Sequence, residues 1–524
     1  MDEITPIPAA DRQGMKWQLS LLIIFIGPIM AMLDSSIVNV AIATMMNDFQ
    51  TTTSHIQWVV TIYMLALGVI VPTSGWLGDY LGYKRLYLYS LFSFTLGSAL
   101  CSIALSENFL IAARVIQAIG GGMIMPTTMS MLYKIVPREK IGSAMGMFGI
   151  SMMVAPALGP TLGGYLVEYV NWRWIFTINV PIGIIGILLA ASLIPEFPQN
   201  HAGSFDILGC LTSSSALFCL LLALSQGQDW GWTSISIVLL IYSSIALFIL
   251  FVFHELTTPN PLLDLRVFKN PSFAMGNLIM VIVTIGMYAG LFYVPLFLQS
   301  IRGLGALKVG LLMLPPALVS GIFLPISGKL YDRFGPIPPV SIGILLISFS
   351  TYLFTNLNLN TPLSTIIGWN CIRSIGMGLT MMPVQTAIMN ALPADKIGRG
   401  SAITNIISRV AGAFGLAFLT ILLNDNNTYF TAYLNWTIND DNLKSLIVSG
   451  VADRTTVMTL LQINIAKLAF VKAIDNLFFL TALITLPAFF LTFFLPRKKE
   501  LKSPSKEIPS AGSTSETDHS IIME

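Results

Sequence analysis

The segment Gly75-Trp-Leu-Gly-Asp79-Tyr-Leu-Gly82-Tyr-Lys84-Arg85 recurs in shortened form as Gly328-Lys-Leu-Tyr-Asp332-Arg-Phe-Gly335. The copy begins 253 positions later (328 − 75). A second pair of segments, Pro137-Arg-Glu-Lys-Ile-Gly142 and Pro393-Ala-Asp-Lys-Ile-Gly398, is separated by 256 positions (393 − 137). Two independent segments that repeat at nearly the same offset predict a chain built from two similar halves.

The composition is that of a membrane protein. The chain of 524 residues is 54% hydrophobic and 10% charged, whereas an ordinary soluble domain is roughly 25% charged. Apolar runs of roughly twenty residues recur along the sequence, and about 20 helical residues cross a hydrocarbon core of roughly 30 Å. The sequence therefore predicts an all-α polytopic protein in a lipid bilayer.

Fourteen membrane spans are expected. The first eight are predicted near residues 17–44, 57–78, 86–106, 109–133, 140–168, 174–194, 206–226 and 232–254. The remaining six are predicted near 272–300, 307–330, 338–357, 362–390, 397–424 and 472–496. An even number of spans returns both termini to the same side of the membrane.

Basic residues indicate which side that is. They gather in the loops of one side: Lys84, Arg85, Lys134, Arg138, Lys140, Arg266, Lys269, Arg333, Lys396 and Arg399. By the positive-inside rule, these loops and both termini are predicted to be cytoplasmic. Arg302 and Lys308 are exceptions on the opposite side. The short N-terminus favours a bacterial cell membrane.

The repeats divide the spans into groups of six, two and six. We expect a cytoplasmic N-terminus (1–16), an N-terminal six-helix bundle (17–194), a central two-helix insert (195–260) and a C-terminal six-helix bundle (261–496). Within the last bundle, residues 425–471 are predicted to form a partly helical external hairpin. Residues 497–524, rich in Ser, Pro, Glu and Lys, are predicted to be a disordered cytoplasmic tail.

Asp34 is the carboxylate expected deepest within a span, about ten residues or roughly 15 Å of helix from its outer end. A charge in hydrocarbon costs several kcal/mol, so such a group faces water, has a partner or binds a proton. Arg114 is expected roughly 8 Å deep in the fourth span, where the two side chains could meet. In the alternative interpretation, Asp34 only bonds to Ser35, Asn39 or helix termini, and Arg114 extends to the membrane interface.

Two further segments could move during a functional cycle. In residues 75–85, glycines permit a tight turn and Asp79 could accept from a helix N-terminus or an arginine. The gating candidates are Gly75, Asp79, Gly82, Lys84 and Arg85. In the fifth span, closely spaced small residues and prolines predict close helix approach and a bend. The residues of this motif are Pro156, Gly159, Pro160, Gly163 and Gly164.

Several function classes are excluded. A net charge of +2 is too small for a nucleic-acid-binding protein. The sequence has no phosphate-binding loop, HExxH motif or GxSxG motif, and its four cysteines lack metal-ligand spacing. We therefore expect neither an enzyme nor a bound metal or other cofactor.

Taken together, these motifs resemble the major facilitator superfamily, and within it the 14-helix drug:proton antiporters of the multidrug efflux type. The resemblance runs from about residue 17 to residue 496 and includes the segment at 75–85, although Tyr80 and Tyr83 stand where basic residues are usual. Other matching segments are Leu33 to Ala41, Arg114 to Gln117, Ala155 to Gly164, Trp172 to Gly183, Pro261 to Arg266 and Gly400 to Gly412.

The resemblance implies a fold of two six-helix bundles with two inserted central helices. It also implies that Asp34 and Arg114 couple transport to protons, that the segment at 75–85 gates the cytoplasmic side, and that the fifth span controls alternating access. A proton gradient would be the energy source. The candidates for the substrate cavity, which lies between the halves, are Asn39, Gln117 and Gln299.

The leading hypothesis is a proton-coupled exporter of small amphipathic compounds, with monovalent cations or neutral amphiphiles favoured because only one carboxylate is deep. An exporter dedicated to one metabolite, lipid or antibiotic is the first alternative. A non-transporting membrane scaffold or sensor is a more remote one. A periplasmic adaptor protein is considered as a further partner.

Overall fold

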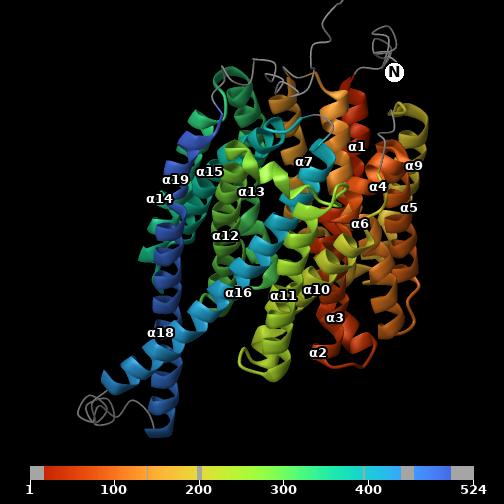
Figure 1. The fold of residues 1–524 in the computed structure, drawn as a ribbon. Coiled ribbons are helices and arrows are strands. Elements are labelled where there is room, and N and C mark those ends of the chain that lie inside the picture. Colours follow the sequence, from red (N-terminus) through yellow and green to blue (C-terminus); the bar gives the residue numbers. More distant parts are fainter. Residues whose placement is uncertain (1–16, 138–139, 198–202, 394–395, 438–453, 497–524) are drawn as a thin grey trace, which may run out of the picture.

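The computed structural model describes residues 17–137, 140–197, 203–393, 396–437 and 454–496. Over these residues the chain is helical and contains no β-strand. Figure 1 shows long helices lying side by side in one tall bundle. The predicted class, an all-α polytopic membrane protein, is confirmed.

The helices follow the order of the predicted spans. The first half contains α1 (Trp17–Asp48), α2 (Thr53–Ile56), α3 (Trp58–Ile70), α4 (Thr73–Leu81), α5 (Tyr83–Ser102), α6 (Glu107–Ile135), α7 (Ile141–Tyr169), α8 (Trp174–Thr177) and α9 (Asn179–Leu193). The insert contains α10 (Ile207–Trp230) and α11 (Ile235–Thr257). The second half contains α12 (Pro271–Ser300), α13 (Ala306–Phe334), α14 (Ile337–Leu353), α15 (Leu363–Asn390), α16 (Ile397–Thr437), α18 (Arg454–Thr485) and α19 (Ala488–Leu491). Three short 3-10 turns, Leu265–Lys269, Phe354–Asn356 and Thr492–Phe494, complete the described elements.

Each predicted span coincides with a helix or a broken helix. Ten helical segments of the described chain are long and apolar enough to cross a membrane by themselves, and α3 with α4 makes an eleventh as a bent pair. The spans predicted at 86–106, 140–168 and 362–390 correspond to α5, α7 and α15. The division into domains at the predicted boundaries stays a prediction.

The second span is broken where the sequence analysis expected a continuous helix. The axes of α3 and α4 differ by 58°, and the break lies at Val71 and Pro72. Proline lacks the backbone N–H that a continuing helix needs, and its ring clashes with the carbonyl one turn earlier. The prediction of one continuous helix over 57–78 is therefore wrong, and the segment from Gly75 to Leu81 belongs to the second helix, α4.

The last two long helices extend well past their predicted ends. The thirteenth span was expected to end at 424, but α16 continues to Thr437, and α18 begins at Arg454. In Figure 1 these two helices project together beyond the bundle at its lower end. The described parts of 425–471 are therefore helical, and residues 438–453 of this predicted hairpin lie outside the described residues. The predicted termini at 1–16 and 497–524 also lie outside them.

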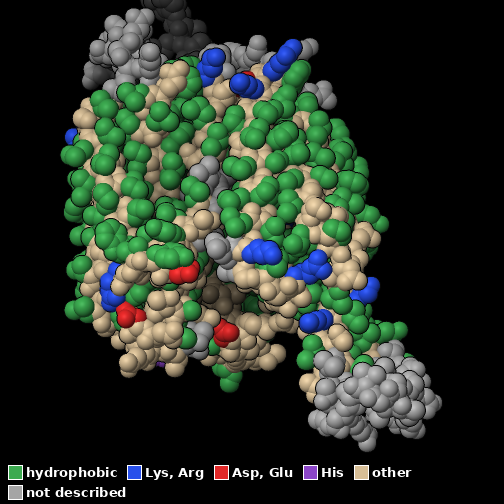
Figure 2. Space-filling view, turned by 180° about the vertical axis from the view of Figure 1, so that it is seen from behind, with side chains coloured by type: hydrophobic (Ala, Val, Ile, Leu, Met, Phe, Trp, Pro, Cys, Tyr) green, Lys and Arg blue, Asp and Glu red, His purple; other side chains and the backbone are tan. Residues whose placement is uncertain are grey.

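The surface of the bundle is largely apolar, as Figure 2 shows. Helix α11 illustrates the pattern, because its buried residues are only Ile237, Ser244, Phe251 and Glu255. Many of its other large apolar side chains, such as Phe248 and Ile249, are exposed. Such faces suit lipid rather than water, which places the protein in a bilayer.

The insert lies along the junction of the two halves, since α10 packs against both α3 and α16. Ser214 Oγ donates to the Val69 carbonyl at 3.0 Å, and Trp76 Nε1 donates to the Gly203 carbonyl at 3.0 Å. Leu65 of α3 packs in one apolar cluster with Leu221 of α10. The insert is thus anchored on the first half at several depths.

Close approach of α5 and α6 depends on glycine, and we expect Gly120→Ala to destabilise the protein. A Cβ at Gly120 would overlap the backbone of Phe94 and Ser90. Forcing an extra methyl group into a packed core costs about 1–3 kcal/mol. Gly164→Ala on α7 is the matched control, since a Cβ there meets nothing within 4 Å. Thermal unfolding in detergent should show a lower Tm for Gly120→Ala alone, and equal Tm values would contradict this packing.

Candidate functional site

Asp34 lies in the centre of the first half and is completely buried. Its Oδ2 accepts from Arg114 Nη1 at 2.5 Å. Its Oδ1 accepts from Gln117 Nε2 at 2.8 Å and from Asn179 Nδ2 at 3.1 Å. The carboxylate therefore has three donors from α6 and α9, and the alternative partners Ser35 and Asn39 are not among them.

Arg114 is also buried, with 1% of its surface exposed. Besides Asp34, its guanidinium donates to Gln117 Oε1 at 2.6 Å and, through Nε, to the Val59 carbonyl at 3.1 Å. The Tyr63 ring lies 3.8 Å from the guanidinium carbon, an arrangement that stabilises a cation over an aromatic face. The alternative in which Arg114 reaches the membrane interface is wrong, because the side chain turns inward.

Removing either charge from this pair would leave the other without compensation. A buried ion pair often adds little net stability, but breaking one by removing a single partner costs about 3–5 kcal/mol. Protonation of Asp34 also removes one charge, while leaving the shape of the side chain unchanged. The geometry therefore makes the charge of each residue important for the position of the other.

The sequence analysis missed three members of this network. Asn179 was noticed within a motif but not as a partner of Asp34, and Ser98 accepts from Gln117 Nε2 at 2.8 Å. Tyr63 contributes its ring to Arg114. The signal that could have found Asn179 is its polarity inside a long apolar span.

Two of the predicted cavity residues lie apart from the network. Asn39 is exposed and donates only to the Ser35 carbonyl within α1, at 3.3 Å. Gln299 is exposed in the last turn of α12. Of the three candidates, the structure brings only Gln117 to Asp34 and Arg114.

The small residues of α7 allow two other helices, α13 and α1, to pack closely against it. At the start of the helix, Gly142 and Gly146 lie against the α13 backbone, where a Cβ would meet the Gly328 and Leu324 carbonyls at 2.6 and 2.7 Å. Farther along, Gly159 and Gly163 lie against Ser36 and Ile37 of α1, directly after Asp34. A Cβ at Gly164 would meet nothing within 4 Å, and the side chains of Pro156 and Pro160 lie outside the described residues.

Most of the basic loop residues named above, among them Lys84, Lys396 and Arg399, lie at one end of the bundle, which we call the basic end. There Asp79 of α4 lies 3.4 Å from Arg399 Nε of α16 and accepts from the Tyr83 hydroxyl at 3.1 Å. Gly75 lies against the backbone of the same arginine, since a Cβ would meet Arg399 Cα at 3.2 Å. We call this contact between the halves the first clasp.

The repeated segment forms a second clasp at the same end. Asp332 of α13 accepts from the backbone N–H groups of Gly142 and Ser143, both at 3.0 Å, and from Ser143 Oγ at 2.7 Å. These are the first residues of α7, so the carboxylate caps that helix. The repeated aspartates thus each contact the start of a helix in the other half, one through an arginine and one through backbone amides.

The other gating candidates shape the first clasp without joining it. Gly82 has a φ of 84°, a value that glycine adopts without strain, and it separates α4 from α5. Lys84 lies 3.7 Å from Glu196, and Arg85 is exposed.

Figure 2 shows that the surface is hollowed between the halves near the end opposite the basic one.

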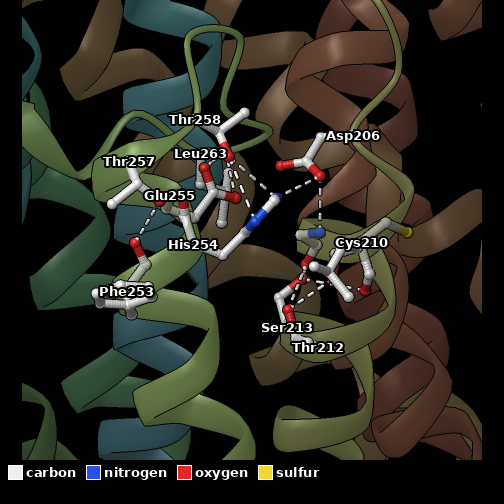
Figure 3. Close-up of polar contacts among 12 residues, drawn as sticks. Asp206, Cys210, Thr212, Ser213, Phe253, His254, Glu255, Thr257, Thr258 and Leu263 are labelled. Atoms are coloured by element: carbon white, nitrogen blue, oxygen red, sulfur yellow. Dashed lines mark hydrogen bonds and ion pairs between the residues drawn. The ribbon is translucent and has the colours of Figure 1, made fainter.

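The inserted hairpin is fixed at the basic end by acidic residues that the sequence analysis did not single out (Figure 3). Asp206 caps α10 through the Gly209 N–H at 2.8 Å, and His254 Nε2 lies 2.8 Å from the same oxygen. Glu255 is completely buried and accepts from the Leu263 N–H at 3.2 Å. The hairpin and the segment that follows it are therefore held together.

That segment continues to the first clasp. Asp264 accepts from Lys396 Nζ at 2.8 Å, and Arg399 Nη1 donates to the Pro261 carbonyl at 3.4 Å. Burial raises the pKa of Asp264, but the hydrogen bond and charge of Lys396, with help from Arg266, outweigh it and leave the pKa below its usual value. The carboxyl is consequently ionised at neutral pH and stays paired with Lys396.

Two similar helical halves, a buried ion pair between helices and clasps that join the halves at one end define a membrane transporter. The chain belongs to the Major Facilitator Superfamily, whose sequence model matches residues 24–416. The uncharacterized MFS-type transporter YhcA of Bacillus subtilis (strain 168) is 36% identical over 514 residues, covering 95% of this chain and 96% of the relative.

The chain is also similar to a second curated protein and to a solved structure. The multidrug resistance protein B homolog of Mycobacterium tuberculosis (strain ATCC 25618 / H37Rv) is 34% identical over 399 residues, covering 75% of this chain and 74% of the relative. The crystal structure of the human organic anion transporter MFSD10 (TETRAN) superposes with a TM-score of 0.60 at 12% identity, covering 91% of this chain and 100% of the other. The predicted family is confirmed, and with it a transporter rather than an enzyme.

Proposed function

We propose that the protein is an antiporter that exports small amphipathic compounds in exchange for protons. The observation that carries this proposal is the buried Asp34–Arg114 pair, with its 2.5 Å contact, in the first half of a transporter. The printed name of the mycobacterial relative, a multidrug resistance protein B homolog, supports a drug-like substrate. The basic end would face the cytoplasm of the cell that bears the protein.

Proton binding would act through Asp34 and its neighbours on α1. Protonation removes the negative charge that holds Arg114, so the pair weakens. Because Ser36 and Ile37 lie against Gly159 and Gly163 of α7, a shift of α1 is transmitted to α7. Helix α7 in turn forms the second clasp with α13. This chain of contacts would link proton binding to opening at the basic end.

The two clasps support a state that is closed towards the cytoplasm. In that state a proton reaches Asp34 from outside and the exported compound leaves. Deprotonation towards the cytoplasm would restore the ion pair and the affinity for the next substrate molecule. Such a cycle requires substrate contacts that differ between the two states, and the space between the halves provides them. An adaptor protein stays a prediction.

The test is proton movement driven by substrate. Purified protein in liposomes that contain a trapped pH dye should change the internal pH when a cationic, a neutral or an anionic amphiphile is added. We expect a response that saturates with substrate concentration and that a proton ionophore abolishes. Response to one compound alone would indicate a dedicated exporter. Transport of labelled substrate without any pH change would refute antiport.

A further inference from the structure

Arg409 of α16 is a cation within the bundle, and no carboxylate of the described residues pairs with it. It lies twelve residues, or roughly 18 Å of helix, from the start of α16. Its Nε is buried and has no hydrogen-bond acceptor, and no ion pair joins it to an acidic residue among those the structure describes. Two other arginines are buried within the helices: Arg114 pairs with Asp34, and Arg373, which has no ion pair among the described residues, has acceptors in Asn370 Oδ1 at 3.3 Å and the Gly286 carbonyl at 3.2 Å.

Two tyrosines from opposite halves, Tyr63 of α3 and Tyr288 of α12, lie in the neighbourhood of Arg409. The Tyr63 hydroxyl is buried and also has no hydrogen-bond partner. The Tyr288 ring lies against Gly412, one turn along α16, where a Cβ would meet it at 2.7 Å. Arg409 is therefore at the junction of the halves, where a transported compound would bind.

The charge balance at this junction is positive. Asp34 and Arg114 neutralise each other, whereas Arg409 adds a positive charge that no described side chain compensates. An isolated charge at membrane depth is costly, and such residues usually mark a substrate or ion pathway. The unused donors, Arg409 Nε and the Tyr63 hydroxyl, are suited to a negatively charged or strongly accepting oxygen.

We propose that Arg409, with the hydroxyls of Tyr63 and Tyr288, binds an anionic oxygen of the exported compound. The inference rests on the proposed export function and narrows it to amphiphiles that carry a carboxylate or phenolate. It replaces the expectation of monovalent cations or neutral amphiphiles. The Arg114 guanidinium lies over the Tyr63 ring and bonds Asp34, so it would screen the Asp34 carboxylate from the bound anion.

Equilibrium binding to two dyes with the same ring system tests this assignment. Fluorescein is an anion at pH 7.5 and rhodamine 123 is a cation, and fluorescence polarisation measures both Kd values for the full chain in nanodiscs. We expect the wild-type protein to bind fluorescein more tightly. Arg409→Gln should weaken fluorescein binding roughly tenfold or more, without weakening rhodamine 123 binding. Arg409→Lys should retain most of the affinity.

Two control variants separate a ligand role from a structural one. Arg373→Gln removes an equal charge from the same half and should leave the fluorescein Kd unchanged. Tyr63→Phe removes only a hydroxyl and should weaken fluorescein binding selectively. Unchanged fluorescein binding in Arg409→Gln, equal loss of both dyes, or a wild-type preference for rhodamine 123 would overturn the proposal.

The outcome is distinguishable from a failure of the proposed antiport. The dye measurement uses no gradient and no proton flux, so it reports on the Arg409 site in the wild-type chain whether or not transport is coupled to protons. Fluorescein preference without substrate-driven proton flux would retain the Arg409 site and reject antiport. Substrate-driven proton flux without a preference for fluorescein would support antiport and reject the Arg409 site.

Discussion

Replacing Asp34 with asparagine is expected to abolish proton movement driven by substrate in liposomes. Asparagine has nearly the shape of aspartate but cannot take up or release a proton at neutral pH. Arg114 would also lose its charged partner, now 2.5 Å away, and breaking a buried pair costs about 3–5 kcal/mol. We expect the pH response to fall to that of liposomes without protein.

Asp48→Asn is the matched control for this experiment. Asp48 is also on α1 but near its end, where it accepts from Trp172 Nε1 at 2.9 Å and from Arg173 Nη1 at 2.9 Å. The control variant should retain proton movement. Size-exclusion chromatography and thermal unfolding in detergent would establish that Asp34→Asn is folded. Full proton movement in a folded Asp34→Asn variant would place coupling on another residue.

Gly328→Ala is expected to shift the protein towards the state that is open at the basic end. A Cβ at Gly328 would overlap the carbonyl oxygen of Gly142 and meet Ser143 Cα at 3.2 Å. Because the obstructing atoms are backbone, they cannot move aside as a flexible side chain would. An overpacking cost of about 1–3 kcal/mol shifts the ratio of the two states by about fivefold to about a hundredfold.

Spin labels would report this shift. Tyr80 and Phe334 are exposed on α4 and α13, and labels at these two positions, in a background without native cysteines, would give the distance between the halves. We expect a larger population at the long distance in Gly328→Ala. Gly321→Ala is the control on the same helix, since a Cβ there meets nothing within 4 Å. Identical distance distributions in both variants would refute the role of the second clasp.

The sequence predicted the fold well because its signals were long and repeated. Apolar runs gave the position of each span, and the copies of the segment at Gly75 indicated the two halves. The break at Pro72 was missed, although proline inside a helix is a known cause of bending. The extension of α16 to Thr437 was missed because residues after 424 are polar. Hydropathy predicts where the apolar segment ends, and the helix continues beyond that point.

The site was predicted less completely. Depth along a helix brought Asp34 and Arg114 to the same level, and the structure shows that they meet. Which residues share a face could not be predicted, because the polar residues of α1 form no periodic stripe along its sequence. Asn179 and Tyr63 therefore remained unassigned, and the assignment of Asn39 to a cavity stays a prediction, with its side chain exposed and donating to the Ser35 carbonyl.

The two clasps, finally, differ in how they would respond to ionic strength. The first joins opposite charges, Asp79 and a half-buried Arg399, and dissolved salt screens such a pair. The second joins Asp332 to backbone amides and a hydroxyl, where no partner carries a formal charge. A duplicated fold would begin with two identical contacts. Their divergence gives this protein one contact that joins two opposite charges and is the more sensitive to ionic strength, and one that depends mainly on hydrogen bonds.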